Sequence, residues 1–308
     1  LDFFNYNILD IKKLSWKINK IEIFTDNNLD KNLLNFENNK KDLFLIVKNY
    51  KLFNILKKKL KSSKYFKKKK FFLKDNYDLI INCDLNHSLT KKFFFKKLEK
   101  DYKGAAYTTI IQHKKTFNHS ATQIFTKLGP IAFLPLNENQ TSIVYSVNKK
   151  NTFNDNYIKS LIKKFNPKYE ITKILKIENF KLKSFSLRYY YYNNILAFGD
   201  LLHKIHPLAG QGFNMTLRDI NLLIKIIKKK ISLGIQLDSL VCQEFETKIK
   251  HKNFIFSQGI DFIYEFFNFE RKTENELLNK SIYLLGKNKS LIKAFTKIAD
   301  EGDFTNLY

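Results

Sequence analysis

The sequence has few of the residues that shape the backbone or carry redox chemistry. Its 308 residues include only 9 glycines, 4 prolines, 2 cysteines and 1 methionine. Cys83 and Cys242 lie far apart in the sequence, so nothing suggests a disulfide framework, and a reducing, intracellular setting is expected. No apolar run approaches the roughly 18 residues of a membrane-spanning helix. Residues 1–14 also lack the basic-then-apolar order of a secretory signal.

Acidic residues are scarce beside basic ones, at 29 against 55, which gives a formal net charge of +26. Such a charge can mark a nucleic-acid-binding protein. Only positions 188, 218 and 271 are arginine, however, and specific recognition of nucleic acid depends largely on the planar arginine fork. We therefore expect a solvated basic surface and no nucleic-acid partner. A preference for polyanions or anionic membranes is the alternative.

Hydrophobic periodicity predicts strands, then a strand-rich middle, then helices. The 44% hydrophobic content is enough for one large domain or two ordinary ones. Strands are expected at 21–24, 43–47, 77–83, 107–112, 122–126, 131–136, 141–147 and 195–198, with long or paired strands over 171–192. Helices are expected at 50–60, 156–165, 213–230, 237–250, 253–267, 274–285 and 291–299. The short turns of the middle region favour an antiparallel sheet, so the expected class is α/β plus α+β.

The rare residues gather in one stretch, 199–220, which reads GDLLHKIHPLAGQGFNMTLRDI. It holds three glycines, one proline, two histidines and the only methionine. A buried-type strand leads into Gly199-Asp200, which places Asp200 at the carboxyl end of a sheet strand. Ligands of open α/β sheets bind at that edge, and a carboxylate there can accept hydrogen bonds from ligand hydroxyls.

A loop and a helix follow Asp200. Pro207 is expected to stiffen the loop, while Gly210 and Gly212 are expected to allow positive φ and close backbone approach. The backbone N–H groups of Gly212, Phe213 and Asn214 are expected to open a helix. Its dipole favours negative charge, such as that of the N1/O2 edge of a reduced flavin.

Other interpretations of these segments stay open. A strand–loop–helix corner without a ligand is one, and a metal triad of Asp200, His203 and His206 is another. Residues 189–192 form either a stacking platform or an aromatic core strand. The apolar residues of 254–267 form either a helix-packing face or a face that lies on a membrane surface.

The stretch 199–220 resembles the C-terminal flavin motif of class A FAD-dependent aromatic hydroxylases. It is most similar to the ubiquinone-biosynthesis hydroxylase family, whose pattern is G-D-A-A-H-x-x-H-P-L-A-G-Q-G-x-N-x-G-x-x-D. Leu201 and Leu202 stand in place of its alanines, and Thr216 stands in place of its later glycine. Segments 43–60 and 125–147 resemble two further family segments in the same order. The resemblance covers most of the chain.

The resemblance implies an FAD-dependent monooxygenase that uses NAD(P)H and O₂ to hydroxylate the aromatic ring of a polyprenyl-phenol ubiquinone precursor. It implies peripheral contact with a membrane, membership of a ubiquinone-biosynthesis complex, and a location in the cytoplasm or on the inner face of a membrane. It assigns no catalytic side chain and no metal. The cofactor-binding residues that it implies are Gly199, Asp200, Pro207, Gly210, Gln211, Gly212, Phe213, Asn214 and Asp84.

The fold implied is an incomplete three-layer FAD-binding domain, interleaved with an antiparallel-sheet substrate domain and followed by a helical C-terminus. The expected parts are residues 1–84, a partial FAD-binding domain that contributes strands to the substrate sheet, and 85–192, the substrate sheet. Residues 193–235 are expected to return to the FAD domain, and 236–308 to form the helical region.

Two departures from the family concern the other end of the cofactor. The first glycine is Gly104, so no G-x-G-x-x-G fingerprint for a pyrophosphate precedes it. Segment 81–91 keeps Asp84 and Ser88 of the family's middle motif but has Leu85 in place of a glycine. Because the chain also starts at Leu1, we expect it to lack the family's first several dozen residues, through truncation or gene decay. Alone it should bind FAD weakly or not at all, and a non-catalytic scaffold or basic binding subunit is the alternative function.

Overall fold

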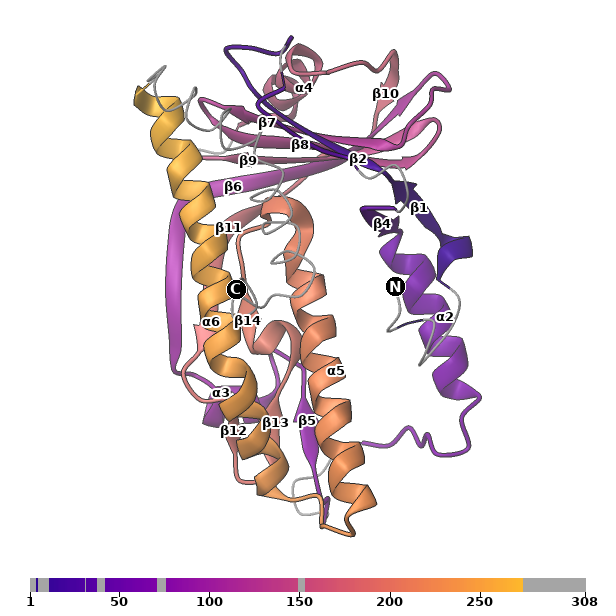
Figure 1. Cartoon of the computed structure of the whole chain (residues 1–308), viewed down its shortest axis with the longest axis vertical. Helices are drawn as coiled ribbons and strands as arrows, with labels where there is room; N and C mark the ends of the chain where they lie inside the picture. The colour runs from indigo at the N-terminus through magenta and orange to yellow at the C-terminus, as the bar shows by residue number, and fades with distance from the viewer. Residues whose placement is uncertain are drawn as a thin grey trace. The chain divides into compact units, whose positions relative to one another are not determined.

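The chain divides into two compact units, each assembled from segments that are far apart in the sequence. The computed structural model describes residues 4, 11–30, 32–37, 42–70, 76–148 and 153–273. The first unit comprises residues 1–67, 103–182 and 265–295, and the second comprises 68–102, 183–264 and 296–308. Figure 1 shows the elements of both. We describe each unit by itself.

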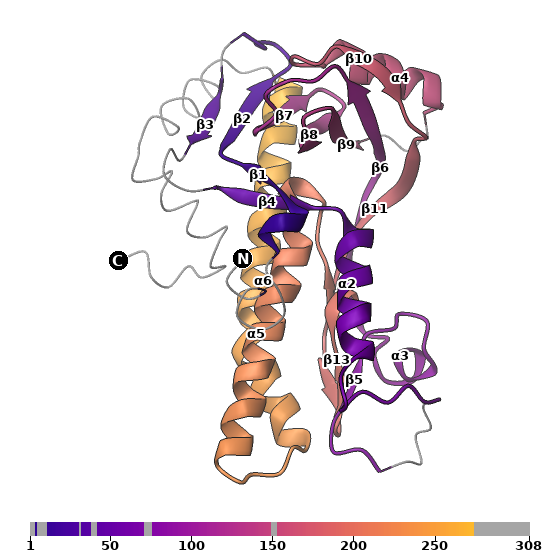
Figure 2. The same cartoon turned by 90° about the vertical axis from the view of Figure 1, so that its right-hand side faces the viewer.

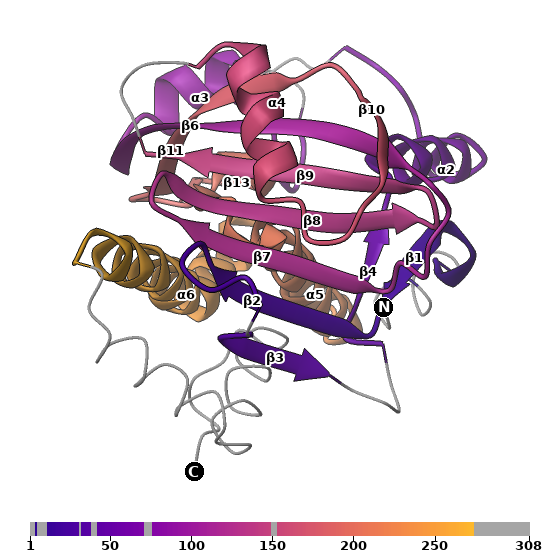
Figure 3. The same cartoon turned by 90° about the horizontal axis from the view of Figure 1, so that it is seen from above.

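A large, mainly antiparallel sheet forms the first unit (Figures 2 and 3). Its strand order is β11-β6-β9-β8-β7-β2-β3, and β10 pairs with β6. β2 and β7 are parallel, whereas β7–β8, β8–β9 and β6–β9 are antiparallel. The strands are β2 (Lys20–Thr25), β3 (Leu34–Glu37), β6 (Lys97–His113), β7 (Ser120–Thr126), β8 (Gly129–Asn137), β9 (Gln140–Val147), β10 (Ile171–Ile174) and β11 (Glu178–Leu187).

Helices and a small sheet complete the first unit. After the short 3₁₀ turn η1 (Lys12–Leu14), β1 (Ser15–Ile18) pairs antiparallel with β4 (Phe44–Val47), and α2 (Asn49–Lys61) follows. Helix α4 (Asp155–Lys164) lies across one face of the large sheet (Figure 3). Its apolar residues share one core with β8 and β9, because Ile158 and Ile162 pack in the same cluster as Phe133 and Ile143.

The second unit contains a three-stranded sheet of order β12-β13-β5. Its elements are β5 (Ile80–Asn82), α3 (Ser88–Phe93), β12 (Tyr191–Tyr192), β13 (Ile195–Ala197), the 3₁₀ turns η2 (Gly199–Leu201) and η3 (Leu208–Gly210), β14 (His203–Lys204), α5 (Gln211–Ser232) and most of α6 (Ser239–Thr273). β14 pairs with residues 185–186 of β11. β6, β11 and α6 contribute residues to both units.

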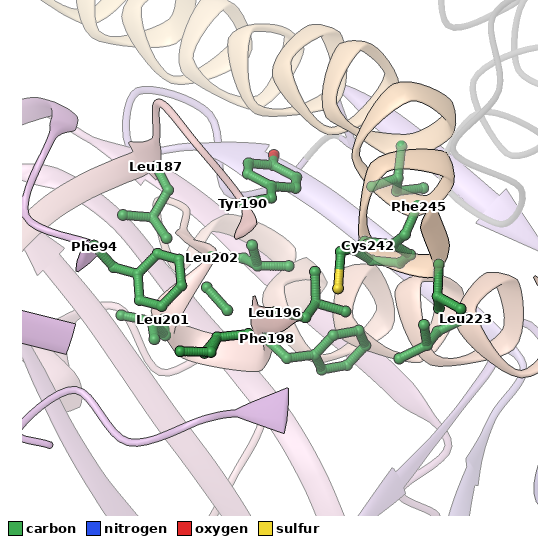
Figure 4. Close-up of a cluster of buried hydrophobic side chains, with 14 of the residues drawn as sticks. Phe94, Leu187, Tyr190, Leu196, Phe198, Leu201, Leu202, Leu223, Cys242 and Phe245 are labelled. Atoms are coloured by element: carbon green, nitrogen blue, oxygen red, sulfur yellow. The ribbon is translucent and has the colours of Figure 1, made fainter. Parts of the chain in front are cut away.

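The core of the second unit joins strand β13 to the helix pair α5 and α6 (Figure 4). All three residues of β13 are buried, as expected of a strand that is covered on both faces. Helices α5 and α6 lie side by side (Figures 1 and 2). Leu223 of α5 packs in one cluster with Cys242 and Phe245 of α6.

Most of the predicted elements within the described residues are confirmed, and several details are wrong. The strand predicted at 77–83 is limited to β5, and α3, β1 and β3 were not predicted. The helices predicted at 237–250 and 253–267 are one helix, α6, because neither of the two residues between them, 251 and 252, is a glycine or proline. The helices predicted at 274–285 and 291–299 lie outside the described residues.

The apolar residues of α6 are used mainly for packing. Phe256, Ile260 and Phe267 are buried, while Phe254 and Phe262 are exposed. The packing interpretation of residues 254–267 is therefore the better one. None of the described helices has both the length and the apolar character needed to cross a membrane.

Candidate functional site

The two aspartates predicted at strand ends lie at one edge of the same sheet. β5 and β13 are parallel neighbours, with Ala197 opposite Asn82, and the N–H of Phe198 donates to the carbonyl of Asn82 at 2.9 Å. Asp84 follows β5 and Asp200 follows β13. Both residues therefore leave the carboxyl edge of the sheet, which is where open α/β sheets bind ligands.

Asp200 lies in the 3₁₀ turn η2 and is exposed. Gly199 begins this turn with a φ of 64°, a left-handed conformation that favours glycine. Partial desolvation first, and the negative charge of Asp200 second, raise the pKa of the Cys83 thiol. That electrostatic effect on Cys83 indicates that the end of β5 and the turn after β13 lie close together.

Asp84 has a local structural role in addition to its position. Its Oδ1 accepts the N–H of Asn86 at 2.8 Å, and its carbonyl accepts the hydroxyl of Thr90 at 2.6 Å. The Thr90 hydroxyl in turn accepts Nδ2 of Asn82 at 2.8 Å. These bonds hold the turn between β5 and α3, as expected of an aspartate that caps a turn. The His87 side chain caps α3, which sequence reasoning missed because histidine is an uncommon cap.

The loop of residues 205–210, which contains Pro207 and Gly210, leads into α5, the longest helix that lies wholly in the second unit. Gly210 is the N-cap of α5, with a φ of 64°, and no side chain caps the helix or places a negative charge in its first turn. The first backbone N–H groups of a helix have no partner within the helix, and its dipole makes this end attractive to anions. α5 also contacts η2, the turn that carries Asp200. The turn that carries Asp200 and the helix that carries residues 211–214 are thus neighbours within the second unit.

Gly212 differs from its predicted conformation. It is helical and does not have positive φ, because α5 starts at Gln211. A Cβ at this position would meet only Cγ1 of Ile205, at an ordinary 3.8 Å. Within the first turn, Nδ2 of Asn214 donates to Oε1 of Gln211 at 3.3 Å, and Phe213 is 53% exposed.

The two glycines should respond oppositely to alanine. Gly210→Ala places a Cβ in the left-handed region and should destabilise the protein by about 1–2 kcal/mol. Gly212→Ala should raise the free energy of unfolding by up to about 1 kcal/mol, because alanine is the better helix former. Urea unfolding of the two variants beside the wild type measures both effects. Equal effects of the same sign would contradict the assigned conformations.

Two further residues of the motif, His203 and Asp219, are buried and hydrogen-bonded to each other. Nε2 of His203 donates to Oδ2 of Asp219 at 2.6 Å, and the two side chains are 2% and 0% exposed. Nδ2 of Asn253, on α6, donates to Oδ1 of Asp219 at 3.1 Å. Both carboxylate oxygens of Asp219 are thus satisfied by buried donors. His203 is therefore committed to Asp219, and the described residues hold no group of three or more His, Cys, Asp or Glu side chains suited to a metal ion.

His206 has very different surroundings. It is fully buried, and neither ring nitrogen has a hydrogen-bond partner among the described residues. Its ring centroid lies 4.1 Å from that of Tyr264 and 4.8 Å from that of Tyr102. Burial first, and the positive charge of Lys100 second, lower the pKa of His206 to about 4. The imidazole is therefore neutral at physiological pH.

A polar cluster adjoins His206 on the Tyr102 side. The Tyr102 hydroxyl donates to Oδ1 of Asp261 and lies 2.9 Å from Oγ of Ser184. Nζ of Lys100 lies 3.6 Å from the second oxygen of Asp261. Burial and the bond to Asp261 raise the pKa of Tyr102. Sequence reasoning missed this cluster, because its members come from three separate parts of the chain.

The fold is that of FAD-dependent monooxygenases. The p-nitrophenol 4-monooxygenase PnpA of Pseudomonas putida DLL-E4 matches 97% of this chain and 85% of its own, with a TM-score of 0.76 and 10% identity. HpxO of Klebsiella pneumoniae, solved with FAD and uric acid, has the same coverage, a TM-score of 0.73 and 10% identity. These similarities confirm the mixed α/β fold expected from the sequence.

Sequence comparison gives the relationship in finer detail. Residues 90–232 match the family model described as an FAD binding domain. The 3-demethoxyubiquinol 3-hydroxylase of Escherichia coli (strain K12) is 31% identical over 156 residues, which is 48% of this chain and 40% of that protein. The ubiquinone biosynthesis monooxygenase COQ6 of Xenopus tropicalis is 25% identical over 233 residues, which is 62% of this chain and 50% of that protein.

The chain is thus similar to ubiquinone-biosynthesis hydroxylases in sequence and to FAD-dependent monooxygenases in fold, which confirms the resemblance seen in its motif. The prediction of FAD as the cofactor is likewise confirmed, because residues 90–232 match an FAD binding domain and the similar HpxO structure contains FAD. The matches span between 39% and 50% of the length of the first three curated relatives.

Proposed function

We propose that this chain acts in the FAD-dependent hydroxylation of the aromatic ring of a polyprenyl-phenol ubiquinone precursor, with NAD(P)H as electron donor and O₂ as co-substrate. The observation that carries the proposal is that Asp84 and Asp200 leave one carboxyl edge of the same sheet, on strands β5 and β13. η2 contacts α5, whose N-terminus has no capping side chain. An exposed carboxylate at a sheet edge, followed in the chain by a helix whose N-terminus no side chain caps, suits a ligand with hydroxyl groups and an acidic ring.

The residues present fit the ring and ribityl end of FAD. Asp200 would accept hydrogen bonds from ribityl hydroxyls, and Asp84 lies at the same sheet edge. Gly210 to Asn214 would line the flavin ring, where the N–H groups at the start of α5 would stabilise negative charge. Pro207 would hold the loop against it. When bound, FAD itself supplies the redox and oxygen chemistry, while the protein supplies position and water exclusion.

The pyrophosphate end of FAD has no corresponding fingerprint in the sequence, whose first glycine is Gly104. This supports weak FAD binding by the chain alone. It is also the best support for the alternative function, a scaffold or basic binding subunit that does not hold FAD.

The remaining assignments follow from the relationship to ubiquinone-biosynthesis hydroxylases. We propose that the sheet strands within residues 107–147 and 171–192 carry the substrate-contacting side chains, as expected for a substrate domain over 85–192. A prenylated phenol would partition into lipid, so we propose peripheral membrane contact on the inner face of a membrane, together with a ubiquinone-biosynthesis complex.

Asp200→Ala is expected to weaken FAD binding by about 10- to 100-fold, because a hydrogen bond to a charged acceptor contributes roughly 1.5–3 kcal/mol. FAD titration followed by flavin fluorescence measures the affinity, up to the high concentrations that a weak site requires. Coupled NAD(P)H oxidation with a prenylated phenol, and incorporation of ¹⁸O from ¹⁸O₂ into the product, tests the reaction itself.

Asp101→Ala is the matched control, since it removes one exposed carboxylate of the same unit whose 3.5 Å pair with Lys183 is at the surface. We expect this variant to bind FAD like the wild type. Unchanged binding by Asp200→Ala would remove Asp200 from the site. No binding by the wild type at any FAD concentration would favour the scaffold function.

A further inference from the structure

The connection between α5 and α6 exposes an unusual number of aliphatic side chains. Ile231 and Leu233 are each 61% exposed, Leu240 is 49% exposed and Ile235 is 43% exposed. We call residues 231–240 the apolar turn. Single exposed aliphatic residues are common on protein surfaces, but four within ten residues mark a contact surface. Figures 1 and 2 show this turn at the end of the α5–α6 pair.

The apolar turn has a defined backbone that holds these side chains outward. Gly234 has a φ of 67°, its N–H donates to the carbonyl of Ile231 at 3.1 Å, and the N–H of Ile235 donates to that of Lys230 at 2.9 Å. This pair of bonds is a Schellman motif, in which the residue at the Ile235 position commonly packs against the residue at the Lys230 position. Here that residue is a lysine, and Ile235 remains exposed.

Positive charge lies on the α5 side of the apolar turn. Between residues 225 and 240 there are four lysines and one acidic residue, Asp238. Lys225, Lys228 and Lys229 are exposed and lie within little more than one helical turn of each other. The Asp238 carboxylate accepts the N–H of Leu240 at 2.8 Å and so caps the start of α6.

We propose that the apolar turn docks on an anionic lipid surface. Ile231, Leu233 and Ile235 would enter the headgroup region, while the exposed lysines would contact acidic headgroups. The apolar turn would be the place where the membrane contact of the proposed function is made. Only the biological reason for this contact rests on the proposed function. Its test needs neither flavin nor substrate.

Composition favours lipid over a protein partner. Protein interfaces are anchored mostly by tryptophan, tyrosine and arginine, and residues 225–240 contain none of these. Aliphatic side chains beside lysines match the apolar and anionic layers of a membrane surface. The other apolar candidate, the α6 face around Phe256 and Ile260, is already buried in packing.

Vesicle co-sedimentation of the full chain tests the proposal. We expect binding to phosphatidylcholine vesicles that contain phosphatidylglycerol, and at least about tenfold weaker binding to phosphatidylcholine alone. Leu233→Ser/Ile235→Ser and Lys228→Gln/Lys229→Gln should each weaken binding to the anionic vesicles by about tenfold or more. A Leu233→Trp variant should show a blue shift of its fluorescence on binding, as the new side chain leaves water.

The matched controls remove the same chemistry elsewhere. Phe95→Ser removes an apolar side chain that is 63% exposed, and Lys57→Gln/Lys58→Gln removes two exposed lysines from α2. Both should bind the vesicles like the wild type. Absence of wild-type binding, or equal losses from the controls, would overturn the proposal. The proposal would also be overturned if the variants of the apolar turn changed self-association, measured by sedimentation velocity, but left vesicle binding unchanged. The apolar turn would then contact a second copy of the chain.

Discussion

Asp219→Ala is expected to lower the free energy of unfolding by about 3–5 kcal/mol, the loss typical of breaking a buried polar pair from one side. The Asp219 side chain is 0% exposed and is bonded to both His203 and Asn253. Alanine would leave those two buried donors without an acceptor, and a buried group without a hydrogen bond loses solvation that nothing replaces. Urea unfolding followed by circular dichroism measures the change.

Asp219→Asn is the conservative control, because asparagine keeps the shape and one acceptor oxygen. It should cost clearly less than alanine. Asp101→Ala, at an exposed pair, should change the free energy of unfolding by less than about 1 kcal/mol. A loss of under 1 kcal/mol for Asp219→Ala would mean that the cluster does not stabilise the fold.

Stability is expected to fall by about 3 kcal/mol as the pH is lowered from 6.5 to 4 because of His206 alone. The pKa of this histidine is about 4 in the folded chain and 6.5 without the fold's influence. The unfolded chain therefore binds more protons in this interval. The contribution of neutral His206 is complete above pH 6.5 and is lost progressively as the pH falls towards 4.

His206→Phe separates this effect from other titrating groups. Phenylalanine fills a similar volume between Tyr102 and Tyr264 without leaving two ring nitrogens unsatisfied. We expect it to raise the free energy of unfolding at pH 7 by about 1–3 kcal/mol and to remove about 3 kcal/mol of the acid-dependent loss. The measurement is urea unfolding at several pH values. An unchanged pH profile would show that His206 does not titrate in this way.

The sequence predicted those parts of the fold and site that depend on local pattern. The strand over 195–198, the amphipathic helices α2 and α4, and the short turns between β7, β8 and β9 all follow from periodicity and turn residues. The motif likewise placed Asp200 after a strand and Gly210 before a helix. Both positions are confirmed by η2 and by the N-cap of α5.

Features that depend on contacts between distant residues could not be predicted. β5 and β13 are separated by more than a hundred residues, so their pairing, which brings Asp84 and Asp200 to one edge, has no local signal. Asn253 shows the same limit. It was predicted to begin a second helix, whereas in the fold it is a buried donor to Asp219 within the single helix α6.

The buried cluster of His203, Asp219 and Asn253 shows that residues of the motif can be retained for two different reasons, cofactor binding and folding. Two of its members belong to residues 199–220, yet their described contacts serve the interior. A descendant that had stopped using flavin would still need them in order to fold. In such a lineage the histidine and aspartate would persist, while Asp200, which is exposed and serves no such cluster, would be free to drift. On the role proposed for Asp200, changes at this residue would therefore accompany loss of the cofactor, whereas changes at Asp219 would accompany loss of the fold.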